Sequence, residues 1–358
     1  MKLENMVRKA TFVGLIGLLP MSAFSNTEVY VPLGSGNAVA VIEAGKSQVV
    51  AEIPGINGSH GLAVSKDGGF IVAGSLIERP KGVAPTAKPA GISEEDHAVH
   101  HGGGTQAKTE HTQTGGNVGT AYLIDAKARK LLRQIDVPGA VHHALITQDG
   151  RYAVLTHPGR GSVSIVDIHG HSVFKEVKTG PATNYAVSKR DGSRIYVSNS
   201  GNDTVSEIDT STWSVVRNLS AGKTPEHIVL SPDENNLYVV NPAGGTVSNI
   251  DLKAGKIASS FNVGRNPHGV DLSDDGRLLF ASSKQDNQVS VFNLKSGEKH
   301  QIDLSPAPYH VTTVTGTGKV YVSSRQEPKI WVLDQKTLAV VDEIKIRGEG
   351  HEMGVFAR

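Results

Sequence analysis

The stretch that decides the fold is Arg194–Asp209, which reads RIYVSNSGNDTVSEID. A close copy follows at Leu237–Asp251 and reads LYVVNPAGGTVSNID. Apolar and polar residues alternate in both copies, which is the pattern of short β-strands, and the Gly, Asn and Asp residues between them favour tight turns. Each stretch is therefore predicted to form two strands joined by a turn.

The same unit recurs along the chain with a period of 42 residues. One marker is an acidic or amide residue that ends a strand of each unit, at Glu43, Asp125, Asp167, Asp209, Asp251, Asn293 and Asp334. A second marker is a turn, mostly Asp-Gly, at Gly68, Gly150, Gly192, Glu234, Gly276 and Gly318. Both markers are 82 residues apart at their first step, which implies an insertion of 40 residues in the second unit. Self-similarity at a fixed period indicates a repeat architecture.

Four short strands per unit, and room for seven units, predict an all-β protein: a seven-bladed β-propeller of four-stranded antiparallel blades. The first unit, Thr27–Ile53, lacks its innermost strand, while the last segment, His351–Arg358, reads as a single strand. We therefore expect the C-terminal strand to complete the first blade and to remove the open edge of the ring.

The start of the chain has the features of a signal peptide. Lys2, Arg8 and Lys9 precede a short apolar stretch, and Ala23-Phe24-Ser25 fits a cleavage site. The expected organisation is a signal peptide at 1–25, a propeller at 26–358 and a His-rich loop insertion at about 76–117, with the mature protein in the periplasm.

Composition excludes several classes of function. The chain contains no cysteine, so it has neither disulfides nor a c-type, covalent haem attachment. With 36 basic and 35 acidic residues, it is not expected to bind nucleic acid. No later apolar run is long enough for insertion in a membrane, and a monomer is expected.

The two stretches quoted above resemble the YVTN-repeat propeller family, and the resemblance covers the chain outside the insertion and the signal peptide. It implies the fold more than the function, because relatives include surface-layer proteins, lactonases, a streptogramin lyase, cytochrome d1-type domains and periplasmic metal-handling proteins.

Histidines gather eight residues before the turn marker. That column reads His60, His142, Asn184, Glu226, His268, His310 and His351, and its neighbour reads Gly61, His143, Tyr185, His227, Gly269, Val311 and Glu352. Equivalent residues of inner strands should face one another around the axis at one depth, so converging imidazoles can supply three or four ligands to one ion.

Nitrogen and oxygen ligands without thiolate suit a Zn or Cu ion. The predicted metal ligands are His60, His142, His143, His227, His268, His310 and His351, with Glu226 or Glu352 as a carboxylate ligand or as the hydrogen-bond partner of a ligand. A water-filled channel is the alternative, because Pro267-His268-Gly269 matches a segment common in these repeats.

The insertion contains a second group of histidines. Ser93–Asp96 is a capping box for a short helix, within which His97, His100 and His101 would share one face, and His111 follows. This spacing can chelate a transition metal. In a meander blade the loop after the second strand emerges on the same face as the start of each first strand, so the loop is predicted to pass an ion to the ring.

These features favour a periplasmic metal-binding propeller that captures, holds or delivers Zn or Cu without turnover, with a metal-transport or redox protein as its partner. One alternative is a metal- or haem-dependent enzyme that uses the same channel, such as a lyase, a lactonase or a cytochrome d1-like protein. The nitrous-oxide reductase propeller gathers copper with a His-His pair like His142-His143, but this chain lacks that enzyme's cysteine-bearing domain. The other alternative is a ligand-free scaffold for protein interactions.

Overall fold

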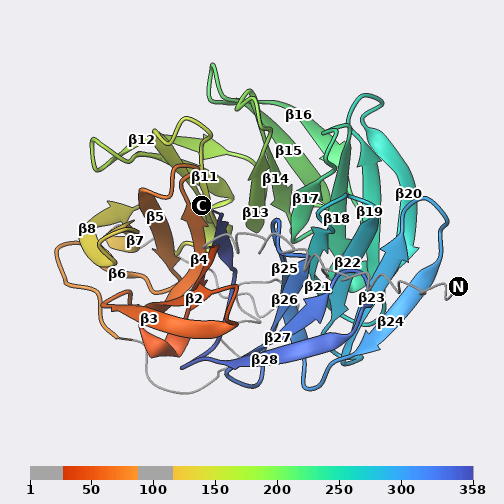
Figure 1. Ribbon diagram of the computed structural model, residues 1–358. Helices are drawn as coiled ribbons and strands as arrows, with labels where there is room; N and C mark the ends of the chain where they lie inside the picture. The colour runs from red at the N-terminus through yellow and green to blue at the C-terminus, as the bar shows by residue number, and fades with distance from the viewer. Residues whose placement is uncertain (1–26, 88–115, 358) are drawn as a thin grey trace, which may run out of the picture.

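The computed structural model describes residues 27–87 and 116–357. Their strands form seven antiparallel sheets around a central axis (Figure 1). Within each sheet the strands are called A to D from the axis to the rim. The predicted seven-bladed propeller is confirmed.

The bounds of the strands, in the order A to D, are as follows. Blade 1 contains β29 (Gly354–Phe356), β1 (Glu28–Pro32), β2 (Ala38–Glu43) and β3 (Gln48–Pro54). Blade 2 contains β4 (Ser59–Val64), β5 (Phe70–Ser75), β7 (Asn117–Asp125) and β8 (Lys130–Val137). Blade 3 contains β9 (Ala144–Ile146), β10 (Tyr152–His157), β11 (Ser162–Asp167) and β12 (Ser172–Lys178). Blade 4 contains β13 (Thr183–Ser188), β14 (Arg194–Asn199), β15 (Thr204–Asp209) and β16 (Ser214–Ser220). Blade 5 contains β17 (Ile228–Leu230), β18 (Asn236–Asn241), β19 (Thr246–Asp251) and β20 (Lys256–Asn262). Blade 6 contains β21 (Pro267–Leu272), β22 (Leu278–Ser283), β23 (Gln288–Asn293) and β24 (Lys299–Asp303). Blade 7 contains β25 (Pro308–Val314), β26 (Lys319–Ser324), β27 (Lys329–Asp334) and β28 (Val340–Lys345).

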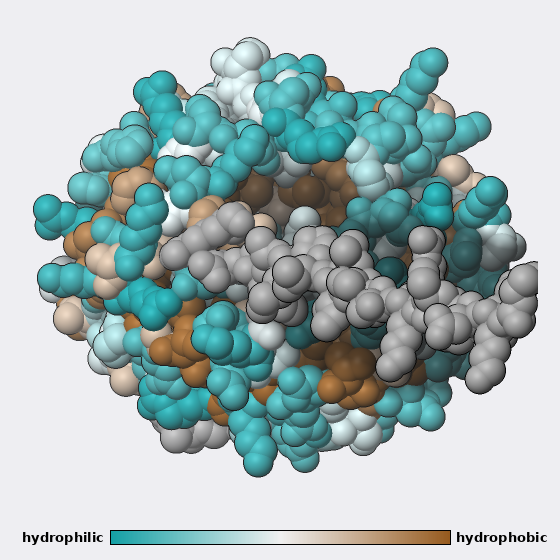
Figure 2. All heavy atoms as spheres, in the orientation of Figure 1, coloured by the Kyte–Doolittle hydropathy of each residue, from teal (hydrophilic) through white to brown (hydrophobic). Residues whose placement is uncertain are grey.

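The core lies between neighbouring blades. Strands B and C, such as β14 and β15, are buried over most of their length, whereas the outer strand β16 alternates between exposed and covered residues. Val163 and Ile165 of β11 pack with Ile195 and Val197 of β14 in the next blade. Around the ring, hydrophilic residues cover the rim and hydrophobic residues appear deeper, beside the central hollow (Figure 2). Face-to-face packing of twisted sheets therefore holds the ring together.

The predicted closure is also confirmed, since β29 pairs with β1 in antiparallel register. Phe356 lies against the turn at Gly68, where φ is +62° and an added Cβ would collide with the aromatic ring. Glycine is therefore required at this contact by both the backbone conformation and the available space.

The repeat register needs one correction, in blade 6. In the other six blades the pairing of strands C and D contains a register shift, but the pairing of β23 with β24 runs without one. A β-bulge holds one extra residue in one of two paired strands. The residue missing from the 42-residue period is therefore the bulge residue of β24, which precedes β25.

This shortening moves the register of blade 7. Pro267 pairs with Ser283 in blade 6, and the equivalent pair in blade 7 is Pro308 with Ser324. Tyr309 consequently occupies the position of His268, and His310 occupies the position of Gly269. The prediction that His310 belongs to the column of His268 was wrong.

Two predicted segments, the signal peptide at 1–25 and most of the insertion, lie outside the described residues. The described part of the insertion contains β6 (Arg79–Pro80), which pairs with the beginning of β7 and adds a fifth strand to blade 2. In the part of the chain that the structure describes, no helix has the length and hydropathy of a membrane span.

Candidate functional site

The beginning of strand A turns two consecutive side chains toward the channel. In blade 2, Ser59 pairs with Ser75 and Leu62 pairs with Ala73, so two residues of β4 face one residue of β5. The same shift occurs in blades 4, 6 and 7. Because a bulge interrupts the alternation of a strand, both histidine columns contribute to the channel. The prediction of a single ring of side chains at one depth is therefore corrected to two columns of side chains that both face the channel.

We call the two corrected columns the channel mouth. The first is His60, His142, Asn184, Glu226, His268, Tyr309 and His351, and the second is Gly61, His143, Tyr185, His227, Gly269, His310 and Glu352. All seven histidines of the mouth are buried.

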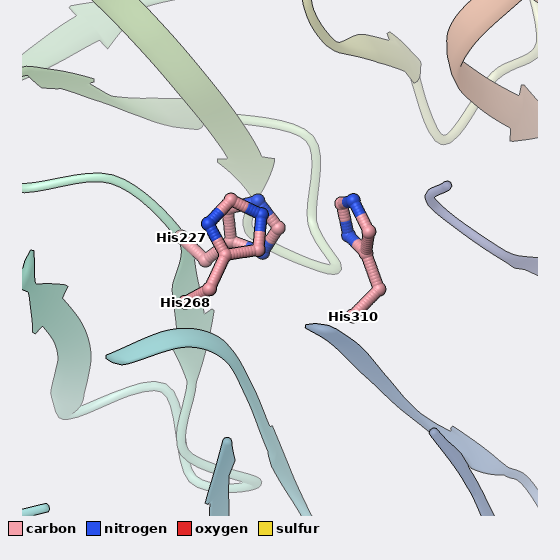
Figure 3. Close-up of side chains that lie close together, drawn as sticks. All are labelled: His227, His268 and His310. Carbon is pink, nitrogen blue, oxygen red and sulfur yellow. The ribbon is translucent and has the colours of Figure 1, made fainter. Parts of the chain in front are cut away.

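Three of these histidines form a compact group of possible metal ligands. His227 precedes β17, His268 lies in β21 and His310 lies in β25, and their rings converge from three consecutive blades (Figure 3). One nitrogen of each lies within 4.8 Å of the others, and the ring centroids are 4.2, 4.7 and 4.9 Å apart. Nitrogen ligands of Zn²⁺ lie at about 2.0–2.1 Å from the ion. We call this group the triad, and a small movement of its rings would bring all three onto one ion.

His268 is the best oriented member of the triad. Its Nδ1 lies 3.1 Å from Oε2 of Glu226, and its ring stacks on Tyr309 with centroids 3.9 Å apart and planes 5° apart. A carboxylate oxygen accepts from Nδ1–H, which leaves the lone pair of the neutral imidazole on Nε2. Metal-binding histidines commonly show this pairing with a carboxylate. Of the two roles predicted for Glu226, ligand or partner of a ligand, this contact matches the second, since Glu226 orients His268.

A second arc of histidines lies beside the triad. The ring of His60 is 4.5 Å from that of His142 and 4.2 Å from that of His351. Nδ1 of His60 donates to the carbonyl of His142 at 3.0 Å, and Nδ1 of His142 donates to the carbonyl of Asn184 at 3.2 Å. Each neutral ring thus keeps its lone pair on Nε2. Within the described residues, however, only the triad brings three ligand atoms within 4.8 Å of one another.

His143 belongs to a separate network that crosses the channel. Its Nδ1 lies 2.5 Å from Oε2 of Glu352, and its Nε2 donates to the carbonyl of Ala186 at 2.9 Å. Tyr185 stacks on the His143 ring at 3.6 Å and donates to the other Glu352 oxygen at 2.7 Å. Burial, and then the charge of Glu352, raise the pKa of Tyr185 well above its ordinary value. Both nitrogens of His143 are thus engaged within the protein, although it was predicted as a metal ligand.

His157 is likewise engaged at both nitrogens. Nδ1 lies 3.0 Å from the carbonyl of Ala140 and 3.1 Å from that of Gly139, and Ser164 Oγ donates to Nε2 at 2.7 Å. Burial lowers the pKa of His157 to about 4, although the two carbonyls oppose this shift. The side chain is neutral and structural.

Hydroxyl groups of strand B fix the backbone of the mouth. Thr156 donates to the carbonyl of Asn184 at 2.7 Å, and Ser198 donates to that of Glu226 at 2.6 Å. Ser282 donates in the same way to the carbonyl of Tyr309 at 2.5 Å. The recurrence independently places Tyr309 in the first column. Sequence reasoning missed Tyr309, and the short strand D of blade 6 was the signal that could have revealed it.

Comparisons with known proteins agree with this architecture. The YNCE-like beta-propeller family model matches residues 179–294, and the cytochrome D1 heme domain model matches residues 114–227. A comparison with the sequences of curated proteins gives no significant match.

Several solved structures share the fold. Hydrazine synthase of Kuenenia stuttgartiensis is similar with a TM-score of 0.63 and 18% identity, over 81% of this chain and 87% of the other. The periplasmic gluconolactonase of Pseudomonas aeruginosa gives a TM-score of 0.66 and 16% identity, over 92% of this chain and 99% of the other. A dihydro-heme d1 dehydrogenase in complex with DHE is similar with a TM-score of 0.63 and 13% identity. The similarity covers 89% of this chain and 63% of the dehydrogenase chain. The repeats and the seven closed blades identify this chain as a seven-bladed β-propeller, of which residues 179–294 match the YNCE-like beta-propeller model.

Proposed function

We propose that the channel mouth binds one transition-metal ion, Zn²⁺ or Cu²⁺, through His227, His268 and His310. The observation that carries this proposal is the convergence of the three imidazoles, one of them held by Glu226 so that its Nε2 carries the lone pair. Three nitrogen ligands and no thiolate suit Zn²⁺ or Cu²⁺ better than a soft ion.

Three protein ligands also leave a coordination position of the ion open. Such sites exchange ligands more easily than closed, four-ligand structural sites. The rigid frame of the mouth reduces the entropy that binding has to overcome. Both properties fit a periplasmic protein that holds an ion and delivers it to a metal-transport or redox partner.

The His-rich insertion is proposed as the capture element. His97, His100, His101 and His111 lie outside the described residues, so their role rests on their spacing in the sequence. The described ends of the insertion, at β6 and at the beginning of β7, belong to the connection between strands B and C. This capture element is proposed to bind the ion more weakly than the mouth, which the blades hold preformed.

A tetrapyrrole is the second candidate ligand. The match of the cytochrome D1 heme domain model to residues 114–227 favours it, and so does the likeness to a dihydro-heme d1 dehydrogenase. The rings of the triad, with centroids 4.2–4.9 Å apart, are in direct contact distance. No macrocycle fits between them, so a single histidine of the triad, and not all three, would hold the iron of a haem.

Titration calorimetry on metal-free, untagged protein tests the proposal. Zn²⁺ and Cu²⁺ should bind the parent tightly with one ion at the mouth, and His268→Ala combined with His310→Ala should weaken that binding at least about 100-fold. The matched control changes His169 and His300, which are exposed, to Ala. Equal affinities in the two double variants, with folding verified by circular dichroism, would reject the triad. An absorption titration with haem decides the second candidate.

A further inference from the structure

Two basic side chains near the triad occupy a position at which the other five blades have no basic residue. The residue that follows strand B is Leu33, Leu76, Pro158, Ser200, Pro242, Lys284 or Arg325 in blades 1 to 7. A basic residue occurs only in blades 6 and 7. These are the blades that contribute His268, Tyr309 and His310.

Tyr309 links the two cations to the triad. The guanidinium carbon of Arg325 lies 5.7 Å from the centre of the Tyr309 ring, and Nζ of Lys284 lies 5.9 Å from it. The same ring contacts His268 at 3.9 Å and His310 at 4.4 Å. Arg325 is only 4% exposed, and its backbone N–H donates to the carbonyl of Ala307 at 2.9 Å. Both cations therefore lie near the aromatic ring that also contacts two histidines of the triad.

This arrangement does not serve the ion alone, because a guanidinium and an ammonium group repel a divalent cation. It does suit an anion that contacts the ion and the two basic groups together. Arg binds carboxylate and phosphate oxygens through a planar fork of N–H donors, and Lys binds them as a point charge. In a buried site such charge-assisted contacts are stronger than at the surface.

We propose that the channel mouth takes up a small oxyanion, carrying a carboxylate or a phosphate group, together with the metal ion. One oxygen occupies the open coordination position of the ion, and the remaining oxygens face Arg325 and Lys284. This inference rests on the proposed metal site and adds the chemical class of the second ligand. The ion is then carried as a ternary complex whose charge the anion partly neutralises.

Calorimetric titration of the Zn²⁺-loaded protein with oxalate, and separately with inorganic phosphate, tests the inference. Arg325→Gln should weaken binding of the preferred oxyanion about 10- to 100-fold, since it removes charge-assisted hydrogen bonds. Lys284→Gln should weaken it less, and Zn²⁺ affinity should stay within about 3-fold in both variants. Arg277→Gln, at an exposed turn beyond the other end of β22, is the matched control and should change nothing. If Arg325→Gln fails to fold, Lys284→Gln carries the test.

The outcomes separate this inference from the proposed function. Tight Zn²⁺ binding with the same oxyanion affinity in all variants, or with no oxyanion binding to the parent, overturns the inference and leaves the triad in place. Absence of Zn²⁺ binding to the parent rejects the proposed function instead. In that case the oxyanion titrations are repeated on the metal-free protein. If only Arg325→Gln and Lys284→Gln then lose oxyanion affinity, these two side chains still form the anion site.

Discussion

Glu352 places Oε2 2.5 Å from Nδ1 of His143, a residue 209 positions earlier in the chain. Its other carboxylate oxygen accepts a hydrogen bond from Tyr185. Glu352 lies two residues before the closing strand of blade 1, whereas its partners belong to blades 3 and 4. One side chain therefore ties the C-terminal segment across the channel, in addition to the short pairing of β29 with β1.

Replacing this carboxylate should be costly. Glu352→Gln keeps the shape but removes the charge from a buried network, so we expect the free energy of unfolding to fall by about 2–4 kcal/mol. Urea denaturation at pH 7 measures the change. The matched control is Glu298→Gln, which alters an exposed pair with His300 at 3.4 Å and should cost less than about 0.5 kcal/mol. Similar losses in both variants would mean that the network does not secure the closure.

Removal of the closing strand should have a larger effect. Deleting residues 354–358 leaves β1 without its inner partner, and the exposed edge should abolish cooperative unfolding and promote association. Val355→Thr, which keeps a β-branched side chain opposite Val29, should still melt cooperatively. Calorimetry combined with size-exclusion chromatography separates the two. A truncated protein that stays monomeric and melts near the parent temperature would contradict this role of β29.

The sequence was sufficient for the fold because each blade repeats the same local pattern. The markers from Asp125 to Asn293 keep a constant spacing, and the unit without a strand A matches the surplus strand at the C-terminus. The error at Tyr309 has a local cause. In blade 6 the turn uses the N–H of Gly276, whereas in blade 7 the equivalent N–H is that of Thr317. Gly318 lies 42 residues after Gly276 and so concealed the residue lost from β24.

The site was only partly predictable for a related reason. The columns identified all seven histidines of the mouth, but strict strand alternation would send His227 and Glu226 to opposite faces. The bulge at the start of strand A, which depends on the pairing with strand B, brings both columns into the channel. The triad contains residues of both columns because of how strand A pairs with strand B, which the sequence alone does not show. Nor could sequence spacing reveal that Glu352 engages His143.

Glu226 should control how tightly the triad holds its ion. Glu226→Gln weakens the hydrogen bond to Nδ1 of His268 and removes the negative charge that makes this ligand more basic, so Zn²⁺ affinity should fall about 10- to 100-fold. Titration calorimetry checks this against Glu234→Gln, in a turn of the same blade, which should bind Zn²⁺ like the parent. An unchanged affinity in Glu226→Gln would leave the orientation of His268 without a role in binding.

Stability should depend on the protonation of His157. Because burial lowers its pKa from 6.5 in the unfolded chain to about 4 in the folded protein, the unfolded state takes up a proton first as the pH falls. The contribution of neutral His157 to the free energy of unfolding is therefore complete above pH 6.5. It is lost progressively as the pH falls from 6.5 through 4. The loss should reach about 2 kcal/mol near pH 5 and on the order of 3 kcal/mol below pH 4.

The variant His157→Gln isolates this contribution from that of the carboxylates, which titrate in the same range. At pH 7 the variant should be less stable than the parent, because it loses hydrogen bonds to the carbonyls of Ala140 and Gly139 and a good fit in a closed site. Since glutamine does not titrate, the difference between the two proteins should shrink as the pH is lowered from 7 to 4.5. Urea denaturation at several pH values measures this difference, and His169→Gln, at an exposed turn, should follow the parent throughout. A difference that stays constant with pH would mean that His157 gains its proton equally well in the folded and unfolded states.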